Sequence, residues 1–225
     1  MRTLAIGDIH GCRASLDHLL AFVAPKPGET IVTLGDYIDR GPDSAGVLDR
    51  LIEMHGEGQL VALRGNHELM MLAADRGAEA LIRFWLECGG INTLTSYGAE
   101  AALEDIPPSH WYFLKHTCAD WYETDTHIFV HANLCHDFPL ADQQADYLQW
   151  EALNPNWHRP HMSGKTMICG HTQQRSGIPL ELKHAVCIDT WAYGGGWLTC
   201  LDTSSGDYWQ ANELGETRRG MLQNP

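Results

Sequence analysis

Five short polar clusters constrain this chain more than any other feature, because each directly follows an apolar run of the kind that forms a buried strand. They occupy residues 7–11, 35–41, 64–68, 131–133 and 170–172. Polar side chains placed just past the ends of parallel strands emerge at one edge of a sheet, where ligand sites of α/β proteins occur. The sequence therefore predicts a fold in which Asp, His and Asn side chains from distant segments converge.

The N-terminal third predicts a parallel sheet with helical crossovers. Apolar runs at residues 3–6, 31–34 and 60–63 alternate with helix-spaced patterns at 15–22, 44–54 and 68–74, an order typical of right-handed βαβ units. Further strands are expected at 121–124, 127–130 and 166–169. We expect the runs at 185–188, 196–201 and 208–210 to belong to a second sheet, and the polar tail after Asn212 to fray.

Length and charge limit the classes of function. A chain of 225 residues favours one domain, residues 1–225, in which 77–116 forms a helical, cap-like segment. The net charge of -14 argues against nucleic acid or an anionic membrane as a partner, although bound divalent cations would still permit an anionic substrate. Seven scattered cysteines without a Cys-x-x-Cys pair, and no signal-like or membrane-length apolar segment, lead us to expect a cytoplasmic protein.

The polar clusters supply the donor set of a two-metal site. Oxygen and imidazole donors without thiolate suit Mn, Fe or Zn, with Mn the first candidate and Ni a further one. Any one donor has a simpler interpretation as a turn or a helix cap, but five clusters in succession favour shared chemistry. Six donors are enough for two ions that share a carboxylate: Asp8, His10, Asp36, Asn66, His131 and His171.

The motifs also carry a family resemblance. Gly-Asp-Ile-His-Gly, Gly-Asp-Tyr-Ile-Asp-Arg-Gly and Gly-Asn-His-Glu resemble the signatures of the phosphoprotein phosphatase branch of calcineurin-like metallophosphoesterases. The resemblance continues through Trp85, Thr93 and Ile188-Asp189-Thr190, covers nearly the whole chain, and is strongest to the compact bacterial serine/threonine-type members. It implies an α/β sandwich of two mixed β-sheets flanked by helices.

The resemblance also assigns roles to the clusters. Asp36 would bridge the two ions, with Asp8 and His10 on the first ion and the other three donors on the second. A hydroxide that bridges the ions would attack phosphorus in line. The resemblance implies two phosphate-gripping arginines, a general acid and a carboxylate that orients this acid: Arg40, Arg64, His67 and Asp39.

Three functions remain open on the sequence. The first is a metal-dependent phosphomonoester hydrolase of the serine/threonine phosphoprotein phosphatase type. The second is a symmetrical diadenosine tetraphosphate or other nucleotide phosphohydrolase, so that the partner would be a phosphoprotein or a phosphorylated small molecule. The third is a metal-binding regulatory protein that has lost turnover. A substrate panel with the metal-loaded protein would separate them.

The chain departs from the family pattern at three positions. Asn133 and Trp191 stand where the family favours Gly, and Ala152 stands where it often has Arg, a guanidinium that Arg159 could replace. A rival motif, Cys-x5-Arg at residues 169–175, is typical of cysteine-dependent phosphatases. Cys169 ends an apolar run, however, and a buried inert thiol is its more ordinary interpretation.

Overall fold

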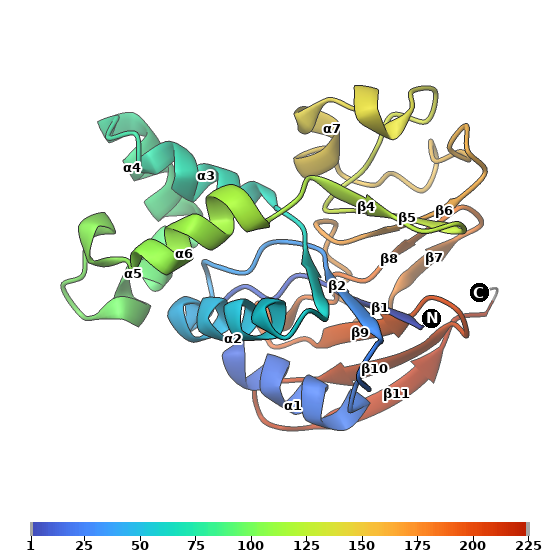
Figure 1. Cartoon of the computed structure of the whole chain (residues 1–225), viewed down its shortest axis with the longest axis horizontal. Helices are drawn as coiled ribbons and strands as arrows, with labels where there is room; N and C mark the ends of the chain where they lie inside the picture. The colour runs from blue at the N-terminus through green and yellow to red at the C-terminus, as the bar shows by residue number, and fades with distance from the viewer. Residues whose placement is uncertain (1, 224–225) are drawn as a thin grey trace.

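In the computed structural model, which describes residues 2–223, two mixed β-sheets pack face to face and helices flank them (Figure 1). The first sheet has the order β11-β10-β9-β1-β2-β3, built from Thr217–Met221, Asp207–Ala211, Leu198–Asp202, Thr3–Ile6, Thr30–Thr33 and Leu60–Ala62. The second has the order β4-β5-β6-β8-β7, built from Trp121–Glu123, His127–Val130, Thr166–Cys169, Ala185–Cys187 and Leu180–Leu182. The expected pair of mixed sheets is confirmed.

The C-terminal strands correct two sequence predictions. Of the three runs expected in a second sheet, only β8 lies there, while β9 and β10 extend the first sheet. β9 pairs antiparallel with β1, which places Leu4 opposite Asp202. The tail after Asn212 does not fray as a whole, because β11 pairs with β10 along its length. Both errors concern pairing between segments far apart in sequence, which local periodicity does not encode.

Helices connect the parallel strands and extend to one side of the sheets (Figure 1). The three predicted crossover helices are confirmed as α1, α2 and α3, at Arg13–Val23, Ser44–Gly56 and Asn66–Ala74. The segment 77–116 contains α4, α5 and α6, at Glu79–Trp85, Ile91–Tyr97 and Pro108–Tyr112. α7, at Ala145–Gln149, covers the second sheet. No helix in residues 2–223 is long and apolar enough to cross a membrane.

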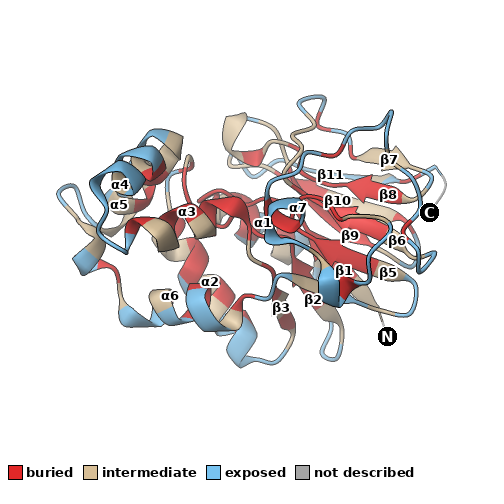
Figure 2. Ribbon diagram, turned by 90° about the horizontal axis from the view of Figure 1, so that it is seen from above, coloured by how far each residue is buried: buried red, intermediate tan, exposed pale blue. Residues whose placement is uncertain are grey.

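The alternation of side chains along β1 explains how the two layers are joined. Leu4 and Ile6 belong to the core shared with α1 and α2, whereas Ala5 belongs to the core between the sheets. This is the two-residue period of a strand buried on both faces. Figure 2 colours β1 largely as buried. The five polar clusters follow β1, β2, β3, β5 and β6, which run parallel within their sheets. The packing of the sheets therefore brings those strand ends together.

Candidate metal centre

Asp36 lies at the centre of the convergent side chains. Its carboxylate shares one group of donor atoms with His10 and His67 and another with His131 and His171, each group spanning less than 4.8 Å. One oxygen of Asp36 lies 3.4 Å from Nε2 of His10, and the other lies 3.5 Å from Nε2 of His131. A carboxylate shared between two donor groups is what a bridging ligand requires.

Each candidate histidine ligand is oriented by a backbone carbonyl. The Nδ1–H groups of His10 and His131 donate to the carbonyls of Ile38 (2.9 Å) and Leu34 (2.8 Å). The remaining nitrogen of each ring keeps its lone pair and points into the cluster. His171 bonds through Nε2 to the carbonyl of Trp150, and its Nδ1 lies 3.2 Å from Nε2 of His131. The oxygen of Asn66 completes this side, 3.0 Å from His131 and 3.1 Å from His171.

Asp8 lies against the same cluster through the backbone of His171, whose N–H is 3.0 and 3.1 Å from the two carboxylate oxygens. Burial and the nearby carboxylates of Asp189 and Asp36 raise the pKa of Asp8 well above its ordinary value. Burial also raises the pKa of Asp189, to about 7. Three buried carboxylates with so little compensating charge would be costly without cations.

The donor chemistry therefore fits divalent ions. Burial lowers the pKa values of His10 and His131, which keeps both rings neutral and ready to coordinate at neutral pH. The donors are oxygens and imidazole nitrogens, as Mn, Fe or Zn would accept. Asp8 is outside both three-residue donor groups, whereas His67 falls inside one. The assignment of Asp8 as a ligand and of His67 as a non-ligand thus remains a proposal.

His67 and Asp39 form a buried pair beside the cluster. Nδ1 of His67 lies 2.7 Å from the carboxylate of Asp39, which also accepts hydrogen bonds from the indole of Trp85 and the hydroxyl of Thr93. Burial alone would lower the pKa of His67, but Asp36 and Asp39 raise it overall. Its Nε2 lies 4.0 Å from Asp36, so the pair holds a proton at the edge of the donor cluster.

The two predicted arginines lie in different surroundings. Arg40 donates from Nη1 to Nε2 of His10 at 2.9 Å, which places its guanidinium at the cluster. All three nitrogens of the Arg64 guanidinium are engaged elsewhere, with the Asp120 carboxylate and with the carbonyls of residues 114, 115 and 118. Arg64 would have to exchange at least one of these partners to grip a phosphate.

Strained backbone positions the site. His10, Asp36, Asp39, Arg40 and His171 all have φ between 46° and 71°, the left-handed region that side chains other than glycine rarely adopt. Such outliers concentrate where surrounding structure fixes a functional geometry.

Close packing of backbone against carboxylate explains two of the motif glycines. A Cβ added at Gly65 would lie 2.2 Å from an Asp36 oxygen, and one at Gly170 would lie 1.9 Å from an Asp8 oxygen. Glu68 joins the loop after β2 to the loop after β3. Its buried carboxylate accepts hydrogen bonds from the backbone N–H groups of Asp36, Tyr37 and Gly65 at 2.8 Å each.

Tyr193 is a site residue that the sequence did not reveal. Its ring lies 4.9 Å from that of His10, and the Arg40 guanidinium stacks over it at 4.8 Å. Its hydroxyl accepts a hydrogen bond of 2.6 Å from the amide of Gln173. The Arg40 guanidinium thus contacts both His10 and Tyr193, whose rings also contact each other. It follows the Ile-Asp-Thr motif by three residues, which was the only signal that it could lie here.

The three departures from the family pattern lie around the cluster. The Asn133 side chain accepts from the N–H of Leu134 in its own loop and donates to the carbonyl of Ala152 in the segment after α7. Trp191 adopts a φ of 64°, and Arg175 stacks over its ring. Arg159 is exposed and bonds to the Asp137 carboxylate through both terminal nitrogens. The Asp137 carboxylate therefore already binds the guanidinium of Arg159, the group that could have replaced the arginine missing at Ala152.

The rival cysteine motif does not form a phosphate-binding loop. Cys169 is fully buried at the end of β6. Its contact with Cys187, followed by burial, raises the pKa of its thiol well above the ordinary value. Arg175 lies over Trp191 instead of facing the sulfur. A reactive cysteine needs a lowered pKa, so the thiol mechanism is disfavoured.

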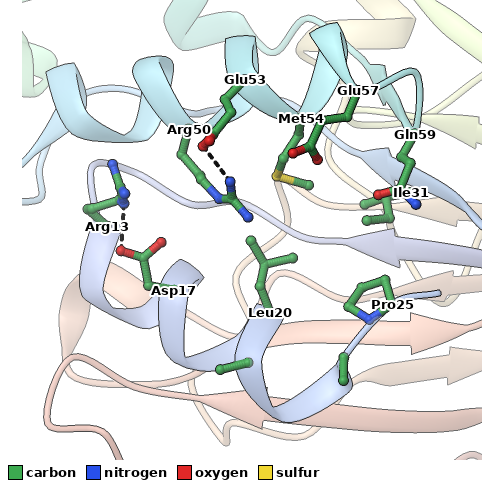
Figure 3. A pocket seen from close by; sticks show the side chains of 12 residues that line it. Arg13, Asp17, Leu20, Pro25, Ile31, Arg50, Glu53, Met54, Glu57 and Gln59 are labelled. Carbon is green, nitrogen blue, oxygen red and sulfur yellow. Dashed lines mark hydrogen bonds and ion pairs between the residues drawn. The ribbon is translucent and has the colours of Figure 1, made fainter. Parts of the chain in front are cut away.

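A wide cleft between α1 and α2 lies apart from these groups (Figure 3). Its volume is about 490 Å³, and Leu20 and Met54 are among the residues that line it. Four of its charged groups form ion pairs, Arg13 with Asp17 and Arg50 with Glu53. None of the candidate ligands or catalytic residues lines it, so volume alone does not identify the site.

Comparison with known proteins places this geometry among phosphoesterases. The family model described as calcineurin-like phosphoesterase matches residues 1–178. The serine/threonine-protein phosphatase 1 of Salmonella typhimurium is 34% identical over 206 residues, which cover 86% of this chain and 88% of that protein. A symmetrical bis(5'-nucleosyl)-tetraphosphatase of Burkholderia thailandensis is 31% identical over 160 residues, which cover 68% of this chain and 50% of that protein.

Solved structures show the same fold at lower identity. A crystal structure described as a candidate diadenosine tetraphosphatase aligns with a TM-score of 0.68 at 22% identity, covering 100% of this chain and 95% of that one. A cold-active protein-tyrosine phosphatase of a psychrophilic Shewanella aligns with a TM-score of 0.61 at 15% identity, covering 97% of this chain and 80% of that one. The phosphoesterase relatives thus differ in the substrates for which they are named.

Proposed function

From the chain's membership of the calcineurin-like phosphoesterase family, which makes it a metal-dependent phosphoester hydrolase, we propose that it dephosphorylates phosphoserine and phosphothreonine side chains with two ions bridged by Asp36. The observation that carries the two-ion mechanism is the position of Asp36, whose carboxylate belongs to both donor groups. The protein substrate is favoured by the relative named for that activity, because the match spans nearly the full length of both chains.

The six donors would hold the ions as the sequence predicts, with Asp8 and His10 on one side of Asp36 and Asn66, His131 and His171 on the other. Bound there, the ions would activate water and neutralise charge on the phosphoryl oxygens. With the lone pair of His10 given to an ion, Arg40 would release that nitrogen and, still stacked on Tyr193, would bind a peripheral phosphoryl oxygen.

His67 would act as the general acid in this mechanism. As the phosphorus–oxygen bond to the serine or threonine breaks, its protonated ring would give a proton to the leaving oxygen. Asp39 would hold that ring in orientation through Nδ1, as the hydrogen bond of 2.7 Å indicates. Burial raises the pKa of Asp39, whereas the hydrogen bonds from His67 and Thr93 oppose that shift and favour a carboxylate beside the ring.

A second candidate substrate is a dinucleoside polyphosphate. It is favoured by the relatives named as symmetrical bis(5'-nucleosyl)-tetraphosphatases, of which this chain spans about half or less, and by a pocket next to the metal centre. The two substrates would share the ions and the general acid. They would differ in what surrounds the leaving group.

Metal removal tests the two-ion mechanism. Exhaustive chelation should abolish the hydrolysis of p-nitrophenyl phosphate, and added Mn²⁺ should restore it. Full activity in thoroughly stripped protein would end the proposal. In parallel, the Mn²⁺-loaded protein should be assayed on a phosphoserine peptide and on diadenosine tetraphosphate. Faster turnover of the peptide supports the first candidate substrate, and faster turnover of the dinucleotide supports the second.

A further inference from the structure

A second pocket, of about 210 Å³, opens beside the metal centre. One wall contains Asn133, which lies two residues after His131. Another contains Ala152 and Leu153, in the segment whose Trp150 carbonyl bonds to His171. Hydrogen bonds tie this segment to the ligand loops, because Ala132 donates to the carbonyl of Leu148 and Leu153 donates to the hydroxyl of Thr172. The pocket is therefore positioned to receive a group attached to a phosphate at the metals.

The pocket contains unused polar groups. Nδ1 of His136 and both ring nitrogens of His158 are buried without a hydrogen-bond partner. These are three of the five such side-chain atoms found in residues 2–223. The backbone of His184 approaches His158 closely enough to favour a proton on that ring, yet it forms no hydrogen bond of proper geometry. Buried donors and acceptors in proteins are nearly always paired, so these atoms indicate a missing partner.

The charge of the pocket favours a neutral partner over an anion. Burial, followed by the proximity of His158 and Arg159, lowers the pKa of His136 to about 4. Burial also lowers the pKa of His158. Both rings are therefore uncharged at neutral pH and offer one donor and one acceptor each. The nearby Arg159 is already neutralised by Asp137.

Aromatic rings flank the same pocket. Trp157 is 80% exposed and Tyr147 is 40% exposed, although side chains of this size are usually covered. The volume is below the roughly 300–1,000 Å³ of sites for drug-sized ligands, and it suits a single planar ring system. Rings that stack on aromatic side chains and carry polar atoms at their edges would satisfy both features.

We propose that this pocket binds the heterocyclic base of a nucleotide leaving group, with Trp157 stacking on the base and His136 and His158 hydrogen-bonding to its edge. The proposal rests on the two-metal hydrolysis described above and extends its second candidate substrate, a nucleoside polyphosphate ester. A peptide substrate would place an amino-acid side chain here, and few such side chains combine a flat ring with several polar edge atoms.

The kinetic test uses Trp157→Ala and His158→Ala. The matched controls are Phe22→Ala and His18→Ala, two exposed positions on α1 that line neither the metal centre nor the pocket. With Mn²⁺ loaded, each pocket variant should raise KM for diadenosine tetraphosphate roughly tenfold, the scale of one lost base–aromatic stack. Turnover of a phosphoserine peptide should stay within about twofold of the wild type, since the peptide leaves the base contacts unused. The controls should match the wild type on both substrates.

A binding measurement separates failure of the pocket from failure of the hydrolase. Saturation-transfer NMR with adenosine on metal-free protein should show binding to the wild type and its loss in Trp157→Ala. Equal kinetic losses on both substrates, or unchanged kinetics in both pocket variants, would overturn the pocket. Cleavage of the peptide without cleavage of the dinucleotide would also overturn the pocket and leave the hydrolase intact. Trp157-dependent adenosine binding to the metal-free protein, together with no hydrolysis of either substrate after Mn²⁺ loading, would support the pocket and refute the proposed activity.

Discussion

Replacing Asp39 by asparagine isolates the role of His67 without emptying the core. The side-chain oxygen of the introduced asparagine, in the place of Oδ1, can still accept the hydrogen bonds that this atom receives from Trp85 and Thr93. The new amide would then face Nδ1 of His67, where the native carboxylate accepts at 2.7 Å. A donor facing that nitrogen forces the ring proton to Nε2 and removes the charge that favoured the imidazolium. His67 would become a neutral and much weaker acid.

The size of the effect depends on the leaving group. General acid catalysis contributes about 10²- to 10⁴-fold, so kcat for a phosphoserine peptide, whose alkoxide needs a proton, should fall at least about 100-fold. The same substitution should slow p-nitrophenyl phosphate less than about tenfold, because a stabilised phenolate departs with little protonation. The contrast between the two substrates is the signature of a lost acid.

The pH profile gives a second readout with a defined sign. Burial lowers the pKa of His67, but Asp36 and Asp39 raise it overall, so the wild-type ring keeps its proton to a higher pH than an ordinary histidine. Activity that requires the protonated ring is lost as pH rises through this pKa. Removing the Asp39 charge lowers the pKa, so the alkaline limb should move to lower pH in Asp39→Asn.

The assay compares kcat for both substrates across pH, in wild type and variant with equal Mn²⁺ content. Thr93→Ser is the matched control, because it keeps the hydroxyl that donates to Asp39. Equal losses on both substrates would show that the pair is structural. An unchanged rate on the peptide would refute the assignment of His67 as the acid.

Three other substitutions test neighbouring conclusions. Tyr193→Ala should raise KM for p-nitrophenyl phosphate roughly three- to tenfold, because it frees Arg40. Tyr193→Phe keeps the stacked ring and should raise KM less. Equal effects of the two substitutions would point to the hydrogen bond with Gln173 instead. Cys169→Ser should leave kcat within about twofold of the wild type, since the buried thiol takes no part in catalysis. A folded but inactive variant would support the thiol mechanism. Arg159→Ala should leave kcat/KM for p-nitrophenyl phosphate within about twofold, because Asp137 already engages its guanidinium on the surface; a tenfold loss would place it at the phosphate.

The sequence predicted the elements whose signals are local. β1, β2 and β3 have short apolar runs stopped by polar clusters, and α1 to α3 have apolar residues at helical spacing. The order of these elements determines a parallel sheet, and so it also predicts that Asp8, Asp36 and Asn66 meet at one edge. Convergence with His131 and His171 follows only if β5 and β6 face that edge, which the family resemblance implied and the fold shows.

Features that depend on distant contacts were beyond the sequence. β9 and β10 were placed in the wrong sheet because β9 pairs with β1, which lies almost 200 residues earlier, and β10 joins the sheet through β9. β11 was missed because its residues are mostly exposed and polar, as an edge strand allows. His136 and His158 matched no motif, and only the fold brings their rings to a centroid distance of 5.0 Å beside the metal centre. Arg64 matched a motif, yet its partners include carbonyls of the short π-helix that follows α6, at Phe113–Thr117, and of Cys118.

The central claim is that two ions share the carboxylate of Asp36. Anomalous diffraction from a crystal of the Mn²⁺-loaded protein tests it most directly. The account predicts two manganese peaks roughly 3.5–4 Å apart, one on each side of Asp36, with His10 at the first and His131 and His171 at the second. A single peak, or two peaks that do not share Asp36, would contradict it.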